Sequence, residues 1–122
     1  MKNTIEIGAI IAINLPTRIP SGHEQEGLRP ALVIGLPEYL DSPRFPTIVV
    51  IPLTTKIGDW SKDNKLYIQI QKGEGNIRKN SLLLIDQILS VDINRINGYI
   101  GTINNKKILE VKSLLITLFS LK

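Results

Sequence analysis

The chain contains no cysteine and only one histidine, His23, among its 122 residues. Without thiolates, neither a disulfide framework nor a cysteine nucleophile is available, and a zinc site would have to be built mostly from carboxylates. We therefore expect no bound metal and no cofactor.

Long hydrophobic runs are also missing. No stretch approaches the roughly 18 to 20 apolar residues that a helix needs to cross a bilayer. The first stretch, MKNTIEIGAIIAINLPTR, is interrupted by Glu6, Gly8, Asn14 and Pro16, so it does not have the form of a secretory signal peptide. These absences predict a cytoplasmic protein with no membrane partner.

Common catalytic signatures are absent as well. The sequence has no glycine-rich phosphate loop, no Gly-x-Ser-x-Gly and no His-Glu-x-x-His. It also lacks a dense group of carboxylates, which a two-metal nuclease site would need. Any nuclease chemistry is therefore expected to be metal-free.

What is present is a modest excess of positive charge. Fifteen Lys and Arg against eleven Asp and Glu give a net charge of +4. This excess favours a polyanionic partner, but plain solubility explains it equally well. The length and the 43% hydrophobic content fit one domain, 1–122, with its own core.

Short, mostly β-branched apolar runs separated by turn residues dominate the chain. They predict strands at 8–14, 30–36, 46–54 and 66–71, two short strands within 81–96, and a last one in GYIGTI, 98–103. The strands at 30 and 46 both begin at a proline. The polar segments 15–27 and 55–65 are long connections, and loops of this length are often functional.

The final segment changes period. From Asn104 onward apolar residues recur at helical spacing, at Ile108, Val111, Leu115 and Leu118. Asn104 or Asn105 is the expected N-cap, and Leu118 and Phe119 are expected to lie on the core face of the helix. Six or seven short strands and one C-terminal helix, without βαβ spacing, favour a mainly β fold: a small antiparallel barrel plus a helix.

Metal-free cleavage is physically possible for RNA, because RNA carries its own nucleophile, the 2′-hydroxyl beside each phosphate. The protein must then supply a base, a proton donor for the leaving oxygen, and positive charge near the phosphorus. Arg29 is the best-placed candidate for the charge, since a guanidinium forks onto two phosphate oxygens and stays protonated. The alternative is an ordinary surface ion pair.

Other candidates have both a functional and an ordinary explanation. His23 is either a base, an acid or a stacking surface, or simply a solvated loop residue. Glu24 and Glu26 are by default solubility charges. The hydroxyls of Thr54 and Thr55 either bind a phosphate or merely suit a strand end.

Three further features stay open in the same way. Asp86 is expected in a turn. Trp60 and Tyr67 either stack on bases or, for Trp60, cover an edge of the core. The loop 56–65, with three lysines, is either a mobile flap over an RNA groove or a solvated connection.

Four segments occur together and in order: GHEQEGLRPALVIG, PTIVVIPLTT, KNSLLLIDQILSVDINRI and IGTI before the terminal helix. With these motifs the chain resembles the MazF/PemK family of toxin ribonucleases, from about Gly8 to Leu118. The resemblance implies an SH3-like (CcdB/PemK-like) barrel that acts as a homodimer. It further implies sequence-specific, metal-independent cutting of single-stranded RNA and a MazE-like antitoxin as partner.

The resemblance also assigns roles to residues. The family's catalytic arginine falls on Arg29, and its catalytic threonine falls on Thr54. The loop that lies at the active site and contacts RNA falls on His23, Glu24 and Gln25. Glu24 and His23 are then the chemically credible bases, with Glu24 assigned to catalysis, because an unperturbed threonine hydroxyl is a poor base.

The remaining expected RNA contacts are Thr55, Lys56, Asp86 and Gln87. Some relatives use the position of Asp86 near the catalytic centre together with an arginine two residues earlier, where this chain has Leu84. That difference favours an Arg/Thr mechanism over a His/Arg/Asp one.

Two other classes of function remain as alternatives. A gyrase-directed toxin shares the fold and needs no ribonuclease site, although the retained Arg29 and Thr54 motifs argue against it. A catalytically silent SH3-like module would use the same loops only to bind RNA or a peptide.

Overall fold

The computed structural model describes residues 5–15, 27–61 and 63–121. Within them the chain forms a seven-stranded antiparallel sheet followed by one α-helix. The strands are β1 (Ala9–Leu15), β2 (Gly27–Gly35), β3 (Thr47–Thr54), β4 (Tyr67–Ile70), β5 (Ser81–Leu84), β6 (Leu89–Asp92) and β7 (Ile96–Thr102), and the helix is α1 (Asn105–Leu118). Five single-turn 3-10 helices lie in the connections: η1 (Pro37–Tyr39), η2 (Asp59–Ser61), η3 (Glu74–Asn76), η4 (Ile85–Gln87) and η5 (Ile93–Arg95).

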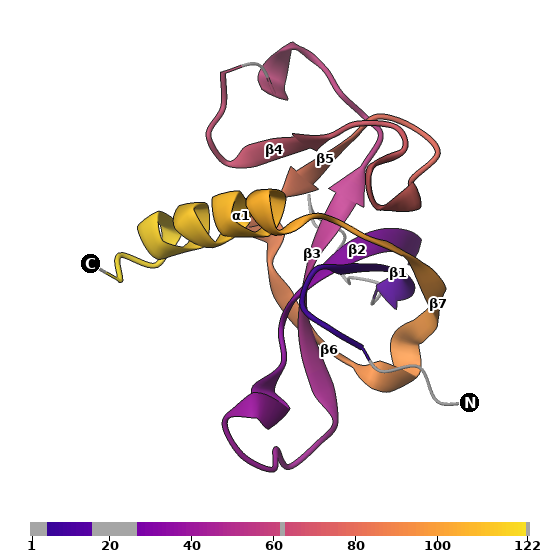
Figure 1. Ribbon diagram of the computed structural model, residues 1–122, viewed down its shortest axis with the longest axis vertical. Coiled ribbons are helices and arrows are strands. Elements are labelled where there is room, and N and C mark those ends of the chain that lie inside the picture. The colour runs from indigo at the N-terminus through magenta and orange to yellow at the C-terminus, as the bar shows by residue number, and fades with distance from the viewer. Residues whose placement is uncertain (1–4, 16–26, 62, 122) are drawn as a thin grey trace, which may run out of the picture.

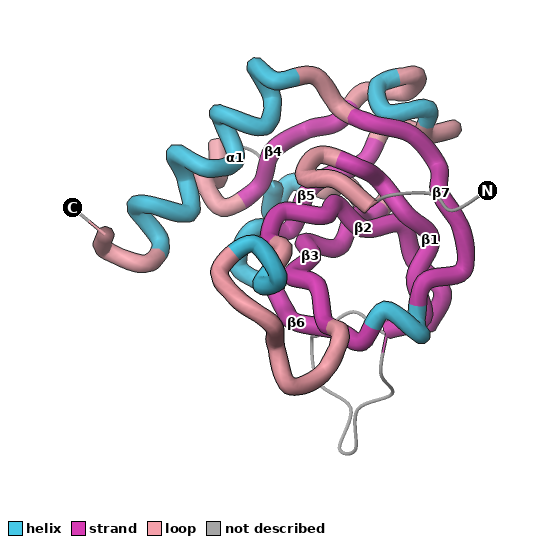
Figure 2. Tube along the Cα trace, turned by 60° about the horizontal axis from the view of Figure 1, so that its bottom comes forward, coloured by secondary structure: helices cyan, strands magenta, loops and turns pink. Residues whose placement is uncertain are grey.

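The strand order is β4-β5-β3-β2-β1-β7, and β6 pairs with the first half of β3. Figure 2 shows β1, β2, β3, β6 and β7 arranged as a ring, while β4 and β5 extend the sheet to one side. α1 lies across the same side as β4 and β5, and its C-terminal part projects beyond the barrel (Figure 1). The expectation of a mainly β antiparallel fold with a C-terminal helix is confirmed.

Alternation along the strands creates two hydrophobic clusters. Residues such as Ile11, Val33 and Val50 form one cluster inside the ring. Their neighbours Ile10 and Leu32 point to the opposite face and pack in a second cluster with residues of β4, β5 and α1. Burial on both faces explains why these strands read as nearly continuous apolar runs.

Of the two prolines expected to begin strands, Pro46 directly precedes β3, which begins at Thr47, whereas Pro30 does not mark a strand start. β2 begins at Gly27, so Pro30 lies inside it, opposite Ala12 of β1. The pairing of β2 with β3 begins only at Ala31, opposite Pro52. Pro52 itself lies where β3 changes partner, between its pairing with β6 and its pairing with β5. Pro30 and Pro52 therefore occupy places where a missing N–H costs little.

The helix begins as predicted and ends differently. Asn104 is the N-cap, and its side chain accepts a hydrogen bond from the N–H of Lys107 (2.9 Å). Ile108 and Val111 are buried. The prediction that Leu118 and Phe119 lie in the core is wrong, because they are 38% and 52% exposed. The periodicity was right, but the last turn of α1 runs past the barrel and has nothing to pack on (Figure 1).

No helix in the described ranges is long and apolar enough to cross a membrane.

Candidate functional site

The ends of β2 and β3 bring Arg29 and Thr54 onto one face of the sheet. Ala31 pairs with Pro52 in antiparallel register. Arg29 lies two residues before Ala31 and Thr54 two residues after Pro52, and side chains two apart along a strand share a face. Arg29 also pairs with Ile13 of β1. The pairing of β2 with β3 thus brings together chain ends that are 25 positions apart in the sequence.

Thr54 is the last residue of β3, and its side chain is only 5% exposed. Its Oγ1 accepts a hydrogen bond from the backbone N–H of Lys56 (3.2 Å). Because the hydroxyl oxygen is used as an acceptor, its proton remains available for donation to another oxygen. The same bond fixes the turn that carries Thr55 and Lys56 out of the strand.

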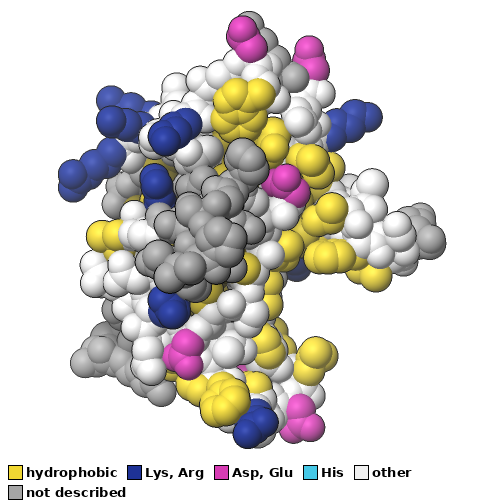
Figure 3. Space-filling view, turned by 180° about the vertical axis from the view of Figure 1, so that it is seen from behind, with side chains coloured by type: hydrophobic (Ala, Val, Ile, Leu, Met, Phe, Trp, Pro, Cys, Tyr) yellow, Lys and Arg dark blue, Asp and Glu magenta, His cyan; other side chains and the backbone are white. Residues whose placement is uncertain are grey.

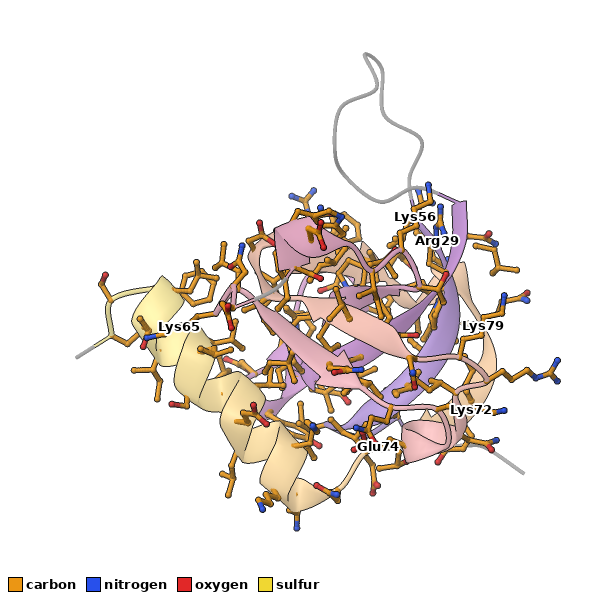
Figure 4. The ribbon with its side chains drawn as sticks, turned by 90° about the horizontal axis from the view of Figure 1, so that it is seen from above. Arg29, Lys56, Lys65, Lys72, Glu74 and Lys79 are labelled. Carbon is orange, nitrogen blue, oxygen red and sulfur yellow. The ribbon has the colours of Figure 1, made fainter. Side chains whose placement is uncertain are left out.

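Arg29 is half-buried, whereas Thr55 and Lys56 are exposed. Figure 4 shows the side chains of Arg29 and Lys56 close together at one end of the barrel. We call Arg29, Thr54, Thr55 and Lys56 the rim. The rim combines the planar guanidinium of Arg29, the ammonium of Lys56 and the buried hydroxyl of Thr54. Together these groups are suited to binding a phosphate.

Three of the expected site residues lie outside the described residues. These are His23, Glu24 and Gln25, and the same holds for Lys62 of the expected flap. The candidate base therefore stays a prediction from sequence.

Asp86 and Gln87 stay predicted RNA contacts. They lie in η4, which directly follows β5, the strand that pairs with Thr54 through Leu82. Asp86 also influences Tyr67, the residue of β4 that pairs with Leu84. Desolvation by burial, and secondarily the negative charge of Asp86, raises the pKa of Tyr67 above its ordinary value of 10.0.

The two aromatic candidates lie together on this same side. Trp60 and Tyr67 contact each other edge to face, with ring centroids 5.2 Å apart. Trp60 is 52% exposed, so it does not close the core. Within the described residues, the expected flap contains the short helix η2, which carries Trp60.

Sequence reasoning missed a cavity of about 510 Å³ beside the rim. Pro30 and Thr55 line it where β2 and β3 end, Arg78 and Lys79 line it from the β4–β5 turn, and Tyr99 lines it from β7. The only available signal was the basic pair in KGEGNIRKN, a segment whose glycines and asparagines predict a turn. The other walls come from segments far apart in the sequence.

No group of three or more His, Asp or Glu side chains that could hold a metal ion occurs among the residues that the structure describes. The chemistry visible at the rim is charge neutralisation by Arg29 and Lys56 and hydrogen bonding by the Thr54 hydroxyl. Such groups stabilise the charge that develops on a phosphate during transfer or cleavage.

The fold and the rim together define a small antiparallel β-barrel with cations at one end. The family model for the PemK-like, MazF-like toxin of type II toxin–antitoxin systems matches residues 6–119. The chain belongs to this family, which confirms the resemblance drawn from its motifs.

Individual relatives agree with this membership. The chain is 28% identical over 92 residues to the endoribonuclease MazF of Staphylococcus saprophyticus, covering 75% of this chain and 73% of that protein. It is 27% identical over 94 residues to the endoribonuclease MazF of Staphylococcus epidermidis, covering 77% and 75%.

Solved structures show the same fold at lower identity. MazF from Deinococcus radiodurans superposes with a TM-score of 0.74 at 20% identity, over 98% of this chain and 99% of that chain. The Mycobacterium tuberculosis toxin MazF-mt6 gives a TM-score of 0.69 at 13% identity, over 93% and 98%. A MazE–MazF structure from Deinococcus radiodurans gives 0.71 at 20% identity, over 99% and 100%.

Proposed function

We propose that this chain is the toxin of a type II toxin–antitoxin pair and that it cuts single-stranded RNA, blocking translation and growth. The observation that supports the proposal is the pairing of Ala31 with Pro52, because Arg29 and Thr54 lie two residues beyond this pair at the ends of β2 and β3. Membership of the toxin family and the relatives named as endoribonucleases support it. We place this activity in the cytoplasm, where messenger RNA is available.

In this mechanism the 2′-hydroxyl of the RNA attacks the adjacent phosphorus and forms a 2′,3′-cyclic phosphate, while the bond to the 5′-oxygen of the next nucleotide breaks and that oxygen takes a proton from water. Arg29 neutralises the non-bridging oxygens, while the Thr54 hydroxyl donates its proton to one of them. Glu24 is the proposed base that removes the 2′-proton, with His23 as the alternative. No step requires a metal ion.

The contacts to RNA are divided between charge and hydrogen bonding. Lys56 and Thr55 are proposed to bind the backbone next to the scissile phosphate, and His23 and Gln25 are proposed to contact the nucleotides there. Asp86 and Gln87 lie beyond the far end of β5 and would contact RNA only if it extends along that strand.

We further propose that the chain acts as a homodimer and is neutralised by a MazE-like antitoxin. The exposed apolar residues at the end of α1 support a protein partner, because isolated apolar clusters of this kind mark interaction surfaces. A relative from Deinococcus radiodurans was solved as a MazE–MazF structure.

The test is incubation of the purified protein with a mixed RNA pool in EDTA, followed by sequencing of the cut ends. We expect discrete cuts at one short sequence. Intact RNA together with inhibition of DNA gyrase would refute the ribonuclease and identify a gyrase-directed toxin. Intact RNA with retained binding would instead indicate a catalytically silent module.

A further inference from the structure

The β4–β5 turn, residues 71–80, is held unusually firmly for a surface segment. Three hydrogen bonds close it: from the N–H of Gln71 to Glu74 Oε1 (2.7 Å), of Lys72 to Asn80 Oδ1 (2.8 Å), and of Gly73 to Ile77 O (3.0 Å). Ile77 also anchors the turn, because its side chain is buried in the core cluster beneath. The turn therefore has a defined shape that its own side chains impose.

The turn is also docked onto β7. The Nδ2 of Asn76 donates a hydrogen bond to the carbonyl of Ile100 (3.1 Å), although this requires a positive φ of 64° at Asn76. Gly101 makes the contact possible: a Cβ there would lie 2.8 Å from Asn76 Cβ and closer still to the carbonyl of Gly75. The cavity between the turn, β7 and the ends of β2 and β3 is therefore preformed.

This fixed turn places two cations on the cavity wall. Arg78 and Lys79 line the cavity, and both are exposed. Neither forms an ion pair with any residue in the described part of the chain. Figure 4 shows Lys79 on the same side of the molecule as Arg29 and Lys56. In Figure 3 most Lys and Arg side chains gather on the side away from α1.

An aromatic ring completes the cavity. Tyr99 is 62% exposed, and its hydroxyl is 2.6 Å from the Thr102 Oγ1, which fixes the ring's outer edge. Ile77 and Ile100 supply apolar walls. The buried hydroxyl of Ser81 donates to the carbonyl of Lys79 (3.0 Å), so its oxygen can still accept a hydrogen bond.

The cavity adjoins the rim. Thr55 belongs to the rim and also lines the cavity, and Pro30, which lines it too, directly follows Arg29 in the chain. A nucleic-acid strand that crosses the ends of β2 and β3 would therefore meet both the rim and the cavity.

We propose that this cavity binds one unpaired nucleotide of the RNA, with its base against Tyr99 and its phosphate on Arg78 and Lys79. The inference rests on the proposed ribonuclease function and names a subsite next to its scissile phosphate. A stacking ring beside two cations is the combination that single-stranded nucleic acid requires. The volume of about 510 Å³ falls within the roughly 300–1,000 Å³ of small-molecule pockets.

The experiment uses the RNA sequence that the wild-type protein cuts, made uncleavable by 2′-O-methylation at the scissile nucleotide. Each position is replaced in turn by an abasic nucleotide, and binding is measured with wild-type protein, Tyr99→Ala and Tyr99→Phe. For the wild-type protein, the abasic replacement at one position should weaken binding about 5- to 150-fold, the range for loss of one base–aromatic stack. Tyr99→Ala should bind the intact RNA as weakly as the wild-type protein binds the RNA with that abasic nucleotide. The abasic replacement at that position should then not weaken its binding further. Tyr99→Phe should behave like wild type.

A second arm tests the phosphate contact. Arg78→Ala with Lys79→Ala should reduce the slope of log affinity against log salt by about 0.7 to 1.4, the range for one or two phosphate charges on a single strand. Lys106→Ala with Lys112→Ala, which removes the same charge from exposed positions on α1, should leave RNA binding nearly unchanged.

The outcomes separate the two proposals. A wild-type protein that cuts RNA, combined with a Tyr99→Ala variant that keeps the wild-type response to every abasic position, overturns the subsite alone. Equal salt slopes for the two double variants overturn the phosphate contact. A wild-type protein that cuts no RNA overturns the ribonuclease and the subsite with it.

Discussion

The two sides of the molecule expose different chemistry. At the rim and the neighbouring cavity the exposed side chains include the cations Lys56, Arg78 and Lys79 and the ring of Tyr99, carried by paired strands and by a hydrogen-bonded turn. At the end of α1 the exposed groups are apolar: Leu118, Phe119 and Leu121 are 38%, 52% and 68% exposed. We call these three residues the helix end. This difference agrees with the RNA contacts proposed for the first side and the protein partner proposed for the second.

The largest expected effect is at the rim. Arg29→Ala should lower the cleavage rate on the order of 10²- to 10³-fold, as expected when one preorganised charge-stabilising group is removed. Arg29→Lys should recover only part of the loss, because a lysine keeps the charge without the fork. Rates on a short RNA substrate measure both, and thermal unfolding checks that the fold is intact. Near-wild-type cleavage by Arg29→Ala would remove the rim from the mechanism.

A smaller loss is expected at the buried hydroxyl. Thr54→Val removes both the acceptor for the N–H of Lys56 and the donor to the phosphate. We expect cleavage to fall about 10-fold or more, and the free energy of unfolding to fall by about 1 kcal/mol, the usual net value of one hydrogen bond. Thr54→Ser, which keeps the hydroxyl, is the matched control and should retain most of the activity.

Substitutions at the helix end should affect self-association. Leu118→Ser with Phe119→Ser should weaken self-association, measured by sedimentation at several concentrations, because it removes apolar surface that a second copy would cover. Its effect on the folding of the monomer should be small, since both side chains are already exposed. If the variant associates as wild type does, this side does not form the dimer interface.

The smallest effect is the pH dependence at Tyr67. Its pKa is raised in the folded state, so the folded protein keeps the phenolic proton that the unfolded chain loses near pH 10. The resulting stability is fully present below pH 10 and is lost as the pH rises through the folded pKa. Unfolding of Tyr67→Phe should show a weaker decline over this window, and Asp86→Asn should make the decline smaller and end it at a lower pH. An unchanged profile in both variants would contradict the assignment.

The sequence predicted most of the fold, because the signals are local. Apolar runs of four to nine residues bounded by Gly, Pro and Asn located the strands, and Asn104 marked the helix start. Leu118 was misplaced because periodicity shows which face of a helix is apolar, but not where the helix runs out of neighbouring structure to pack on.

In the candidate site, too, the sequence predicted the residues that local motifs carry and missed the cavity that distant segments form. Arg29 and Thr54 were found because short motifs carry them, and the strand register then explains their proximity. The cavity was missed because Pro30, Lys79 and Tyr99 belong to segments that meet only in three dimensions. The turn that shapes it has the composition of an ordinary loop, and no local pattern shows that its Asn76 is bonded to Ile100 of β7.

Removal of a single oxygen from the RNA tests the central claim most directly. A substrate with 2′-deoxyribose at the scissile nucleotide lacks the proposed nucleophile but keeps every phosphate that Arg29 and Lys56 would bind. The proposed mechanism predicts wild-type binding with no cleavage at that position in EDTA, while the all-RNA substrate is cut. Cleavage of the deoxy-substituted strand at the same site would contradict attack by the 2′-hydroxyl.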